Sequence, residues 1–184
     1  MSDYKQADDI LLLKAAIDGD PDAFGELYER NAAVIFRYLY AHLGNRLDAE
    51  DLTEDVFMRV WRSLPSYREY GVPFLAYLFR VARHALIDQY RKSGQKKQQV
   101  STEDVLLLDH QPGPAEVVFA NLEQDQIHGA LRKLNDDYRT VLVLRFLSDL
   151  STEETAQAMG RSPGAVRVLQ HRALGALRSL LEGK

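Results

Sequence analysis

The most informative stretch for the fold is residues 151–166, which read STEETAQAMGRSPGAV. Ser151 and Glu154 match a capping box, in which the serine side chain accepts a hydrogen bond from the amide three residues on and the glutamate reaches back. Gly160 suits the left-handed residue that ends a helix, and Ser162-Pro163 reads as a cap followed by proline at the first helical position. The stretch therefore predicts a helix-turn-helix whose second helix runs to Gly183.

Small and apolar side chains within this stretch fit the same interpretation. Ala156 lets two helices cross closely, and Val166 fills their junction. An α-helix fits the major groove of DNA, where arginine and histidine reach base edges or phosphates. The side chains placed for such contacts, on the exposed first half of the second helix, are Arg167, Val168, His171 and Arg172. The alternative is an ordinary helical hairpin whose arginines only solvate one face.

Helical periodicity also dominates the rest of the chain, and no segment shows sustained strand-like alternation. Capping residues, glycines and prolines predict a short helix near residues 8–18 and longer ones from Asp20-Pro21 to Gly44, from Asp48 to Pro65, from Pro73 to about Lys92, from about Ala115 to Leu134 and from Asn135 to Leu147. Residues 95–118 are polar and acidic and contain Pro112-Gly113-Pro114, so they predict a linker. We predict an all-α fold of two small helical domains, residues 1–94 and 119–184, joined by this acidic linker.

The composition is that of an ordinary soluble globular protein. The chain has 184 residues, 46% hydrophobic and 27% charged, and it contains no cysteine, which excludes disulfide scaffolds and thiolate chemistry. It shows neither a run long enough to span a bilayer nor a signal peptide, so we expect a cytoplasmic protein without membrane insertion. The five histidines show no metal-ligand spacing, and phosphate loops and nucleophile motifs are absent from the sequence. We therefore expect a non-enzymatic protein without metal or cofactor.

Net charge alone argues against nucleic acid, but the charge is segregated. The total is −4, whereas residues 1–60, 61–97, 98–131, 132–160 and 161–184 sum to −7, +6, −6, −1 and +4. Because charges interact over roughly 8 Å at physiological salt, these local sums matter more than the total. In residues 67–97 basic side chains alternate with aromatic ones, a combination that suits single-stranded nucleic acid. The alternative is that the aromatic residues belong to the core.

Taken together in their order, several motifs resemble one family. DAEDLTEDVFMRVW (48–61) resembles the polymerase-binding helix of extracytoplasmic-function (ECF) sigma factors of the sigma-70 family. FLAYLFRVARH (74–84) is similar to their promoter-melting and −10-reading helix. VLVLRF (141–146), LSTEETA (150–156) and SPGAVR (162–167) resemble their −35-reading domain. The resemblance covers nearly the whole chain and makes residues 1–94 sigma region 2 and residues 119–184 sigma region 4.

This resemblance implies partners and site residues. It implies that core RNA polymerase is bound through Asp48, Asp51, Leu52, Glu54, Asp55, Phe57 and Met58. It implies that melted −10 promoter DNA is held by Tyr67, Arg68, Tyr77, Arg80, Arg83, His84, Arg91 and Lys92. It implies that duplex −35 DNA is read by Ser162, Arg167, Val168, His171 and Arg172.

Two further expectations concern regulation and the competing function. The resemblance places the acidic linker along the polymerase channel, and we expect control by a separate protein, such as an anti-sigma factor, or by expression. The alternative function is a helix-turn-helix regulator that binds duplex DNA without being a polymerase subunit. That alternative explains residues 135–184 but leaves the acidic helix and the aromatic-basic block unexplained.

Overall fold

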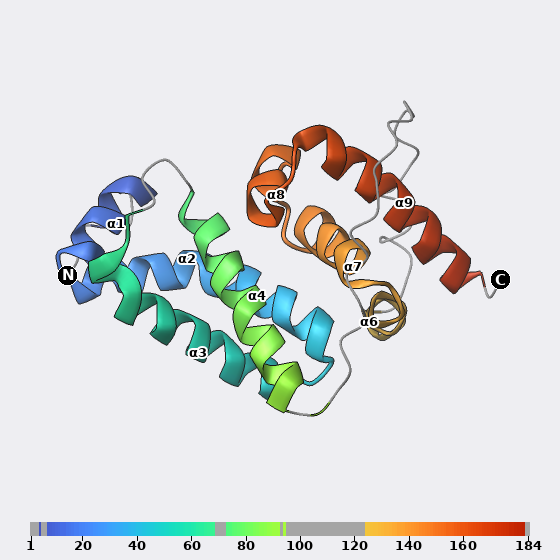
Figure 1. The fold of residues 1–184 in the computed structure, drawn as a ribbon, viewed down its shortest axis with the longest axis horizontal. Helices are drawn as coiled ribbons and strands as arrows, with labels where there is room; N and C mark the ends of the chain where they lie inside the picture. The colour runs from blue at the N-terminus through green and yellow to red at the C-terminus, as the bar shows by residue number, and fades with distance from the viewer. Residues whose placement is uncertain (1–3, 5–6, 69–72, 93, 95–123, 183–184) are drawn as a thin grey trace.

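The computed structural model describes residues 4, 7–68, 73–92, 94 and 124–182, and every regular element within them is a helix. The first four helices form one group, called here the N-terminal bundle (Figure 1). They are α1 (Asp9–Ile17), α2 (Pro21–Leu43), α3 (Arg46–Ser63) and α4 (Phe74–Lys92), with the short 3₁₀ turn η2 (Leu64–Ser66) after α3. The predicted linker and the predicted helix start near Ala115 lie outside the described residues.

The boundaries of α2 follow the predicted local signals. The Asp20 carboxylate accepts from the amides of Asp22 and Ala23, at 2.9 and 3.3 Å, and Pro21 opens the helix. Gly44 ends it with a φ of 70°, a conformation that costs glycine nothing. The predicted start of α3 at Asp48 is wrong. Asn45 caps this helix by accepting from the Leu47 amide at 2.9 Å, and asparagine caps a helix as well as aspartate does.

The remaining helices form the C-terminal bundle. They are α6 (Gln124–Lys133), α7 (Asp136–Leu142), α8 (Thr152–Met159) and α9 (Pro163–Leu181), and the stretch η3 (Val143–Leu147) continues α7 as a π-helix. Both bonds of the predicted capping box are present: the Glu154 amide donates to Ser151 Oγ at 3.1 Å, and the Ser151 amide donates to Glu154 Oε2 at 2.7 Å. The helix-turn-helix is therefore α8, the turn at Gly160, and α9.

The two bundles lie side by side and share one continuous core. Helix α4 packs against α8, and α2 packs against α6, α7 and η3 (Figure 1). Fully buried side chains come from both bundles, among them Leu39 and Leu78 from the first and Leu142 and Leu144 from the second. The predicted all-α organisation is confirmed. None of the described helices combines the length and apolarity that crossing a bilayer requires.

Candidate polymerase and nucleic-acid interfaces

One face of α3 presents acidic and apolar side chains to solvent. Asp48, Asp51 and Glu54 are exposed, and Met58 follows on the same side with 47% of its surface accessible. Leu47, at the start of the helix, is 70% exposed. Since a helix repeats every 3.6 residues, positions 48, 51, 54 and 58 form one stripe, named here the acidic face of α3. This stripe joins negative charge to exposed apolar surface, as expected of a surface that binds a basic protein partner.

Three other residues predicted to bind polymerase are engaged within the bundle. Leu52 and Phe57 are buried, with 7% and 3% of their surfaces accessible. Phe57 packs edge-on against Tyr28 with ring centroids 4.7 Å apart. Asp55 pairs with Arg59 at 2.8 Å, and Arg59 also bonds Asp88 of α4 at 3.1 Å. These side chains shape and support the acidic face; their direct contact with polymerase stays a prediction.

Helix α4 carries five exposed basic side chains, named here the basic face of α4: Arg80, Arg83, His84, Arg91 and Lys92. Burial of Phe74, Leu78, Ala82 and Ala85 fixes the orientation of the first four, because apolar residues at three- and four-residue steps occupy one side of a helix. Lys92 is in line with Phe74 and is exposed as the last residue of α4. Tyr77 is half-buried, donates to or accepts from Ser63 Oγ at 2.6 Å, and lies 5.8 Å beneath the Arg80 guanidinium. The predicted set of basic residues is thus displayed together on one helix.

The loop before α4 holds the other two residues predicted to hold the melted strand. Tyr67 is only 5% exposed and packs edge-on against Tyr77, with ring centroids 4.8 Å apart. In this position its ring supports the wall of an apolar groove of about 590 Å³, beside Phe74 and Leu75, and has little surface free for stacking on a base. The exposed Arg68 folds back and donates to the carbonyls of Tyr67 and Pro65, at 2.8 and 3.2 Å.

The first half of α9 displays the residues predicted to read duplex DNA. Arg167, His171 and Arg172 are exposed and Val168 is half-buried, whereas Val166, Leu169 and Ala173 face the core. Arg167 lies 3.7 Å from Glu153 of α8 in a solvent-exposed ion pair. Ser162 is the helix cap and accepts from the Ala165 amide at 3.2 Å. The predicted side chains therefore share the outer surface of the second helix of a helix-turn-helix.

Three arginines whose roles were not predicted from the sequence hold this motif in place. Arg145 donates to Gln170 of α9 at 3.1 Å and to the Leu150 carbonyl, so it ties the loop before α8 to the recognition helix. Arg161, in the turn between α8 and α9, pairs with Asp137 of α7 at 2.5 Å. Such long-range partners leave no periodic signal in a sequence.

The third arginine, Arg139, is 4% exposed and closes the end of α6. Its guanidinium donates to the carbonyls of Leu131, Arg132 and Leu134, at 2.9, 2.8 and 2.8 Å. The Leu131 and Arg132 carbonyls belong to the last turn of α6 and the Leu134 carbonyl follows it directly, at the end where backbone acceptors run short of intrahelical donors. The Leu131 carbonyl also accepts from the Leu134 amide at 3.1 Å. A buried positive charge at this end also opposes the negative pole of the helix dipole.

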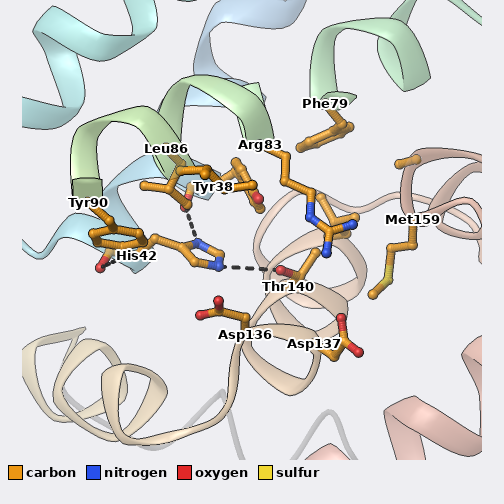
Figure 2. Close-up of a pocket in the computed structure, with 13 residues that line it drawn as sticks. Tyr38, His42, Phe79, Arg83, Leu86, Tyr90, Asp136, Asp137, Thr140 and Met159 are labelled. Atoms are coloured by element: carbon orange, nitrogen blue, oxygen red, sulfur yellow. Dashed lines mark hydrogen bonds between the residues drawn. The ribbon is translucent and has the colours of Figure 1, made fainter. Parts of the chain in front are cut away.

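A small cavity of about 50 Å³, lined by both polar and apolar side chains, lies where the two bundles meet (Figure 2). His42 Nδ1 bonds the Tyr38 carbonyl at 2.8 Å, and His42 Nε2 lies 3.3 Å from Thr140 Oγ1 of the other bundle. Burial, followed by the nearby positive charge of Arg139, lowers the pKa of His42 to about 3, so this imidazole is neutral at physiological pH. Burial likewise raises the pKa values of Tyr38 and Tyr90.

Comparison with known proteins agrees with this geometry. Residues 27–96 match the family described as Sigma-70 region 2, and residues 124–177 match Sigma-70, region 4. The chain is 35% identical over 171 residues to the ECF RNA polymerase sigma factor BldN of Streptomyces coelicolor, an alignment covering 92% of this chain and 64% of BldN. It is 37% identical over 180 residues to ShbA of Streptomyces griseus, covering 93% of this chain and 94% of ShbA.

Solved structures show the same fold. CnrH, in complex with the cytosolic domain of CnrY, superposes with a TM-score of 0.67 and 26% identity over 96% of this chain and 98% of that chain. The Bartonella quintana sigma factor RpoE, in complex with the anti-sigma factor NepR, gives a TM-score of 0.63 at 24% identity, over 86% of this chain and 96% of RpoE. The chain belongs to the sigma-70 family, and within it to the ECF sigma factors, which confirms the resemblance seen in the sequence.

Proposed function

We propose that this chain is the subunit that directs core RNA polymerase to promoters. The acidic face of α3 docks on polymerase, the basic face of α4 with its preceding loop holds the melted −10 element, and the first half of α9 reads the −35 duplex. In this proposal residues 1–94 and 119–184 are the two functional domains, and the linker connects them. The role is that of a non-enzymatic cytoplasmic factor.

One observation carries this proposal: the acidic face of α3, the basic face of α4 and the basic side chains on the first half of α9 are exposed on three different helices of one fold. A regulator that only binds duplex DNA would need α9 but has no use for the acidic face of α3. A basic face that carries aromatic neighbours, such as Tyr77 on α4, suits an unpaired strand better than a duplex. The acidic face, in turn, would repel DNA and therefore favours a protein partner.

Reversing two charges on the acidic face tests the proposal. The double variant Asp51→Lys with Glu54→Lys is expected to weaken binding to bacterial core polymerase by at least about tenfold, because attractive pairs become repulsive ones. Both side chains are exposed, so circular dichroism and the thermal midpoint should stay unchanged. Fluorescence anisotropy of the labelled chain with core polymerase measures the affinity.

The matched control reverses two exposed aspartates at the ends of α1, Asp8→Lys with Asp18→Lys, and is expected to bind like the wild type. Equal affinity of both double variants would show that the acidic face of α3 is only solvated. A wild-type chain that forms no complex with polymerase but still protects a duplex site would instead support the helix-turn-helix regulator.

A further inference from the structure

The proposed function makes no use of an apolar groove between α1 and the start of α4, named here the α1 groove. It is the groove of about 590 Å³ that Tyr67 and Phe74 line on one side, and α1 lines the other side with Ile10, Leu13 and Ile17. Ile10 is 62% exposed, so the groove opens to solvent. An apolar hollow that is open to solvent marks a binding surface.

Two polar side chains of the α1 groove have bonding capacity left over. Asn31 is 7% exposed, and its Nδ2 donates to the Leu27 carbonyl at 2.8 Å. None of the residues that the structure describes donates to Asn31 Oδ1. Lys14 is exposed at the rim and forms no ion pair within the described part of the chain. The groove therefore offers one buried acceptor and one cation.

The carboxylates that line the same groove are already engaged. Asp9 pairs with Arg30 at 2.9 Å, and the Glu154 carboxylate accepts from the Ser151 amide at 2.7 Å. Lys14 is thus the unbalanced charge among the lining residues. Complementarity favours an occupant that is apolar in the middle, negative at its ends and able to donate from backbone amides.

A segment of the predicted linker has this composition. Residues 103–109 read EDVLLLD, four consecutive apolar residues between acidic ones. Residues 98–131 contain no lysine or arginine, so the negative charge of the segment is not balanced by its neighbours along the chain. A solvated tether has no need of such an apolar run, because linkers that stay in water are polar.

The chain before this segment is long enough to bring it to the groove. Leu107 is 15 residues from Lys92, the last residue of α4, and an extended chain of that length spans about 50 Å. Helix α4 has 19 residues and is about 28 Å long, and its first residue, Phe74, lines the groove. The first connection therefore exceeds the distance that it must cover.

The chain after the segment is also long enough. Leu107 is 17 residues from Gln124, the first residue of α6, which allows about 56 Å. The ring of His128, one turn into α6, lies 4.8 Å from that of Tyr40 on α2. Asn31 is nine residues from Tyr40 on the same helix, or about 14 Å along its axis. The second connection therefore reaches the groove as well.

We propose that residues 104–109 of the linker dock in the α1 groove of the same chain. The leucines cover Ile10 and Leu13, a backbone amide of the segment donates to Asn31 Oδ1, and a flanking carboxylate pairs with Lys14. The linker is then anchored to the N-terminal bundle beside the start of α4. The inference goes beyond the proposed function and does not depend on it, because every contact lies within the free chain.

Paramagnetic relaxation measured by NMR on the isotope-labelled full chain tests where the segment lies. The chain has no cysteine, so Asp18→Cys, exposed and next to Ile17, carries a single spin label. This label is expected to broaden the amide signals of residues 105–108. A label at Ser179→Cys, exposed near the end of α9 on the far side of the molecule, should leave them sharp (Figure 1). Any other pattern overturns the docking.

Two pairs of variants identify the contacts. Ile10→Asp sets a negative charge in the groove against the acidic segment, and hydrogen exchange of amides 105–108 should become about tenfold faster. Leu11→Asp is the matched control, since Leu11 is 59% exposed on the same helix but does not line the groove, and it should keep the wild-type rate. Equal rates in the wild type and both variants would contradict the docking.

The second pair changes the segment itself. Leu106→Ser with Leu107→Ser should sharpen the signals that the Asp18→Cys label broadens, whereas His110→Ser with Gln111→Ser, just beyond the segment, should not. Circular dichroism is expected to be the same for all variants. Mixing spin-labelled chains with separate isotope-labelled chains detects a second copy as the occupant, and broadening in that mixture would refute docking within one chain. None of these measurements contains polymerase, so failure of the proposed function is distinguishable from failure of the docking.

Discussion

Acidification is expected to weaken the contact between the two bundles through His42. The imidazole is buried between the bundles, and its pKa of about 3 while they are packed together lies well below the ordinary value of about 6.5. The charged groups that face it are Arg83 on α4 and Arg139 and Asp136 on α7, with the Tyr38 and Tyr90 hydroxyls nearby. Burial first, and then the positive charges of Arg139 and Arg83, keep the proton off the imidazole while the bundles are packed together.

The direction and size of the effect follow from linkage. A depressed pKa means that the contribution of His42 to the contact between the bundles is fully present above pH 6.5 and is lost as the pH falls toward the pKa of the packed bundles. If separation of the bundles restores the ordinary pKa, lowering the pH from 7.5 to 5.5 multiplies the ratio of chains with separated bundles to chains with packed bundles by about 10. Any pKa below about 4.5 in the packed bundles gives the same factor, since His42 then stays unprotonated there at both pH values.

The assay places spin labels at Glu29→Cys on α2 and Ser179→Cys on α9, two exposed sites in a chain without cysteine, and measures the distance between the bundles by double electron–electron resonance. Circular dichroism at each pH confirms that the helices persist. His42→Gln removes the titrating group and should flatten the response between pH 7.5 and 5.5. His84→Gln, at an exposed histidine on α4, is the matched control and should retain the response. An equal response in wild type and His42→Gln would refute the assignment of the pH dependence to His42.

Two further predictions concern the C-terminal bundle. Arg139→Met removes the guanidinium from three carbonyls at the end of α6, of which Leu131 keeps the Leu134 amide as donor, and should lower the free energy of unfolding by about 3–5 kcal/mol in guanidinium denaturation. The exposed Arg178→Met serves as control, and a loss below about 1 kcal/mol for Arg139→Met would contradict the capping role. Arg172→Ala should weaken −35 binding by the polymerase complex and, if its partner is a phosphate, reduce the salt dependence of log K by about one contact. If the DNA footprint and the salt dependence of log K are both unchanged, Arg172 does not contact DNA.

Local signals predicted the helices well because a helix end is decided by neighbouring residues. Asp20, Gly44 and the Ser151–Glu154 box act within four residues of themselves, and the structure contains each of these caps. The predicted start of α3 was wrong because Asn45 and Asp48 can both cap this helix, and the structure uses Asn45. Local signals also missed the π-helical stretch at Val143–Leu147, where α2 packs against the widened helix.

The candidate surfaces were predictable to the extent that periodicity separates exposed from buried positions. Arg80, Arg167 and Asp51 are exposed as expected, because the apolar residues at three- and four-residue steps face the core. Tyr67 departs from this expectation, since its burial depends on Tyr77, ten positions further along the chain. Partners at such separations, like Arg161 with Asp137, arise only when the helices pack.

The sequence by itself determined an all-α chain with a helix-turn-helix, an acidic helix and a basic-aromatic helix, because caps and periodic patterns act over a few residues. The acidic and basic blocks of net charge follow the order of these elements along the chain. Only the tertiary structure decided that the two bundles close on each other, with His42 against Thr140 and Arg83 in their shared cavity. The physical reason is that burial and contact between bundles depend on packing across the whole chain, which local propensity does not encode.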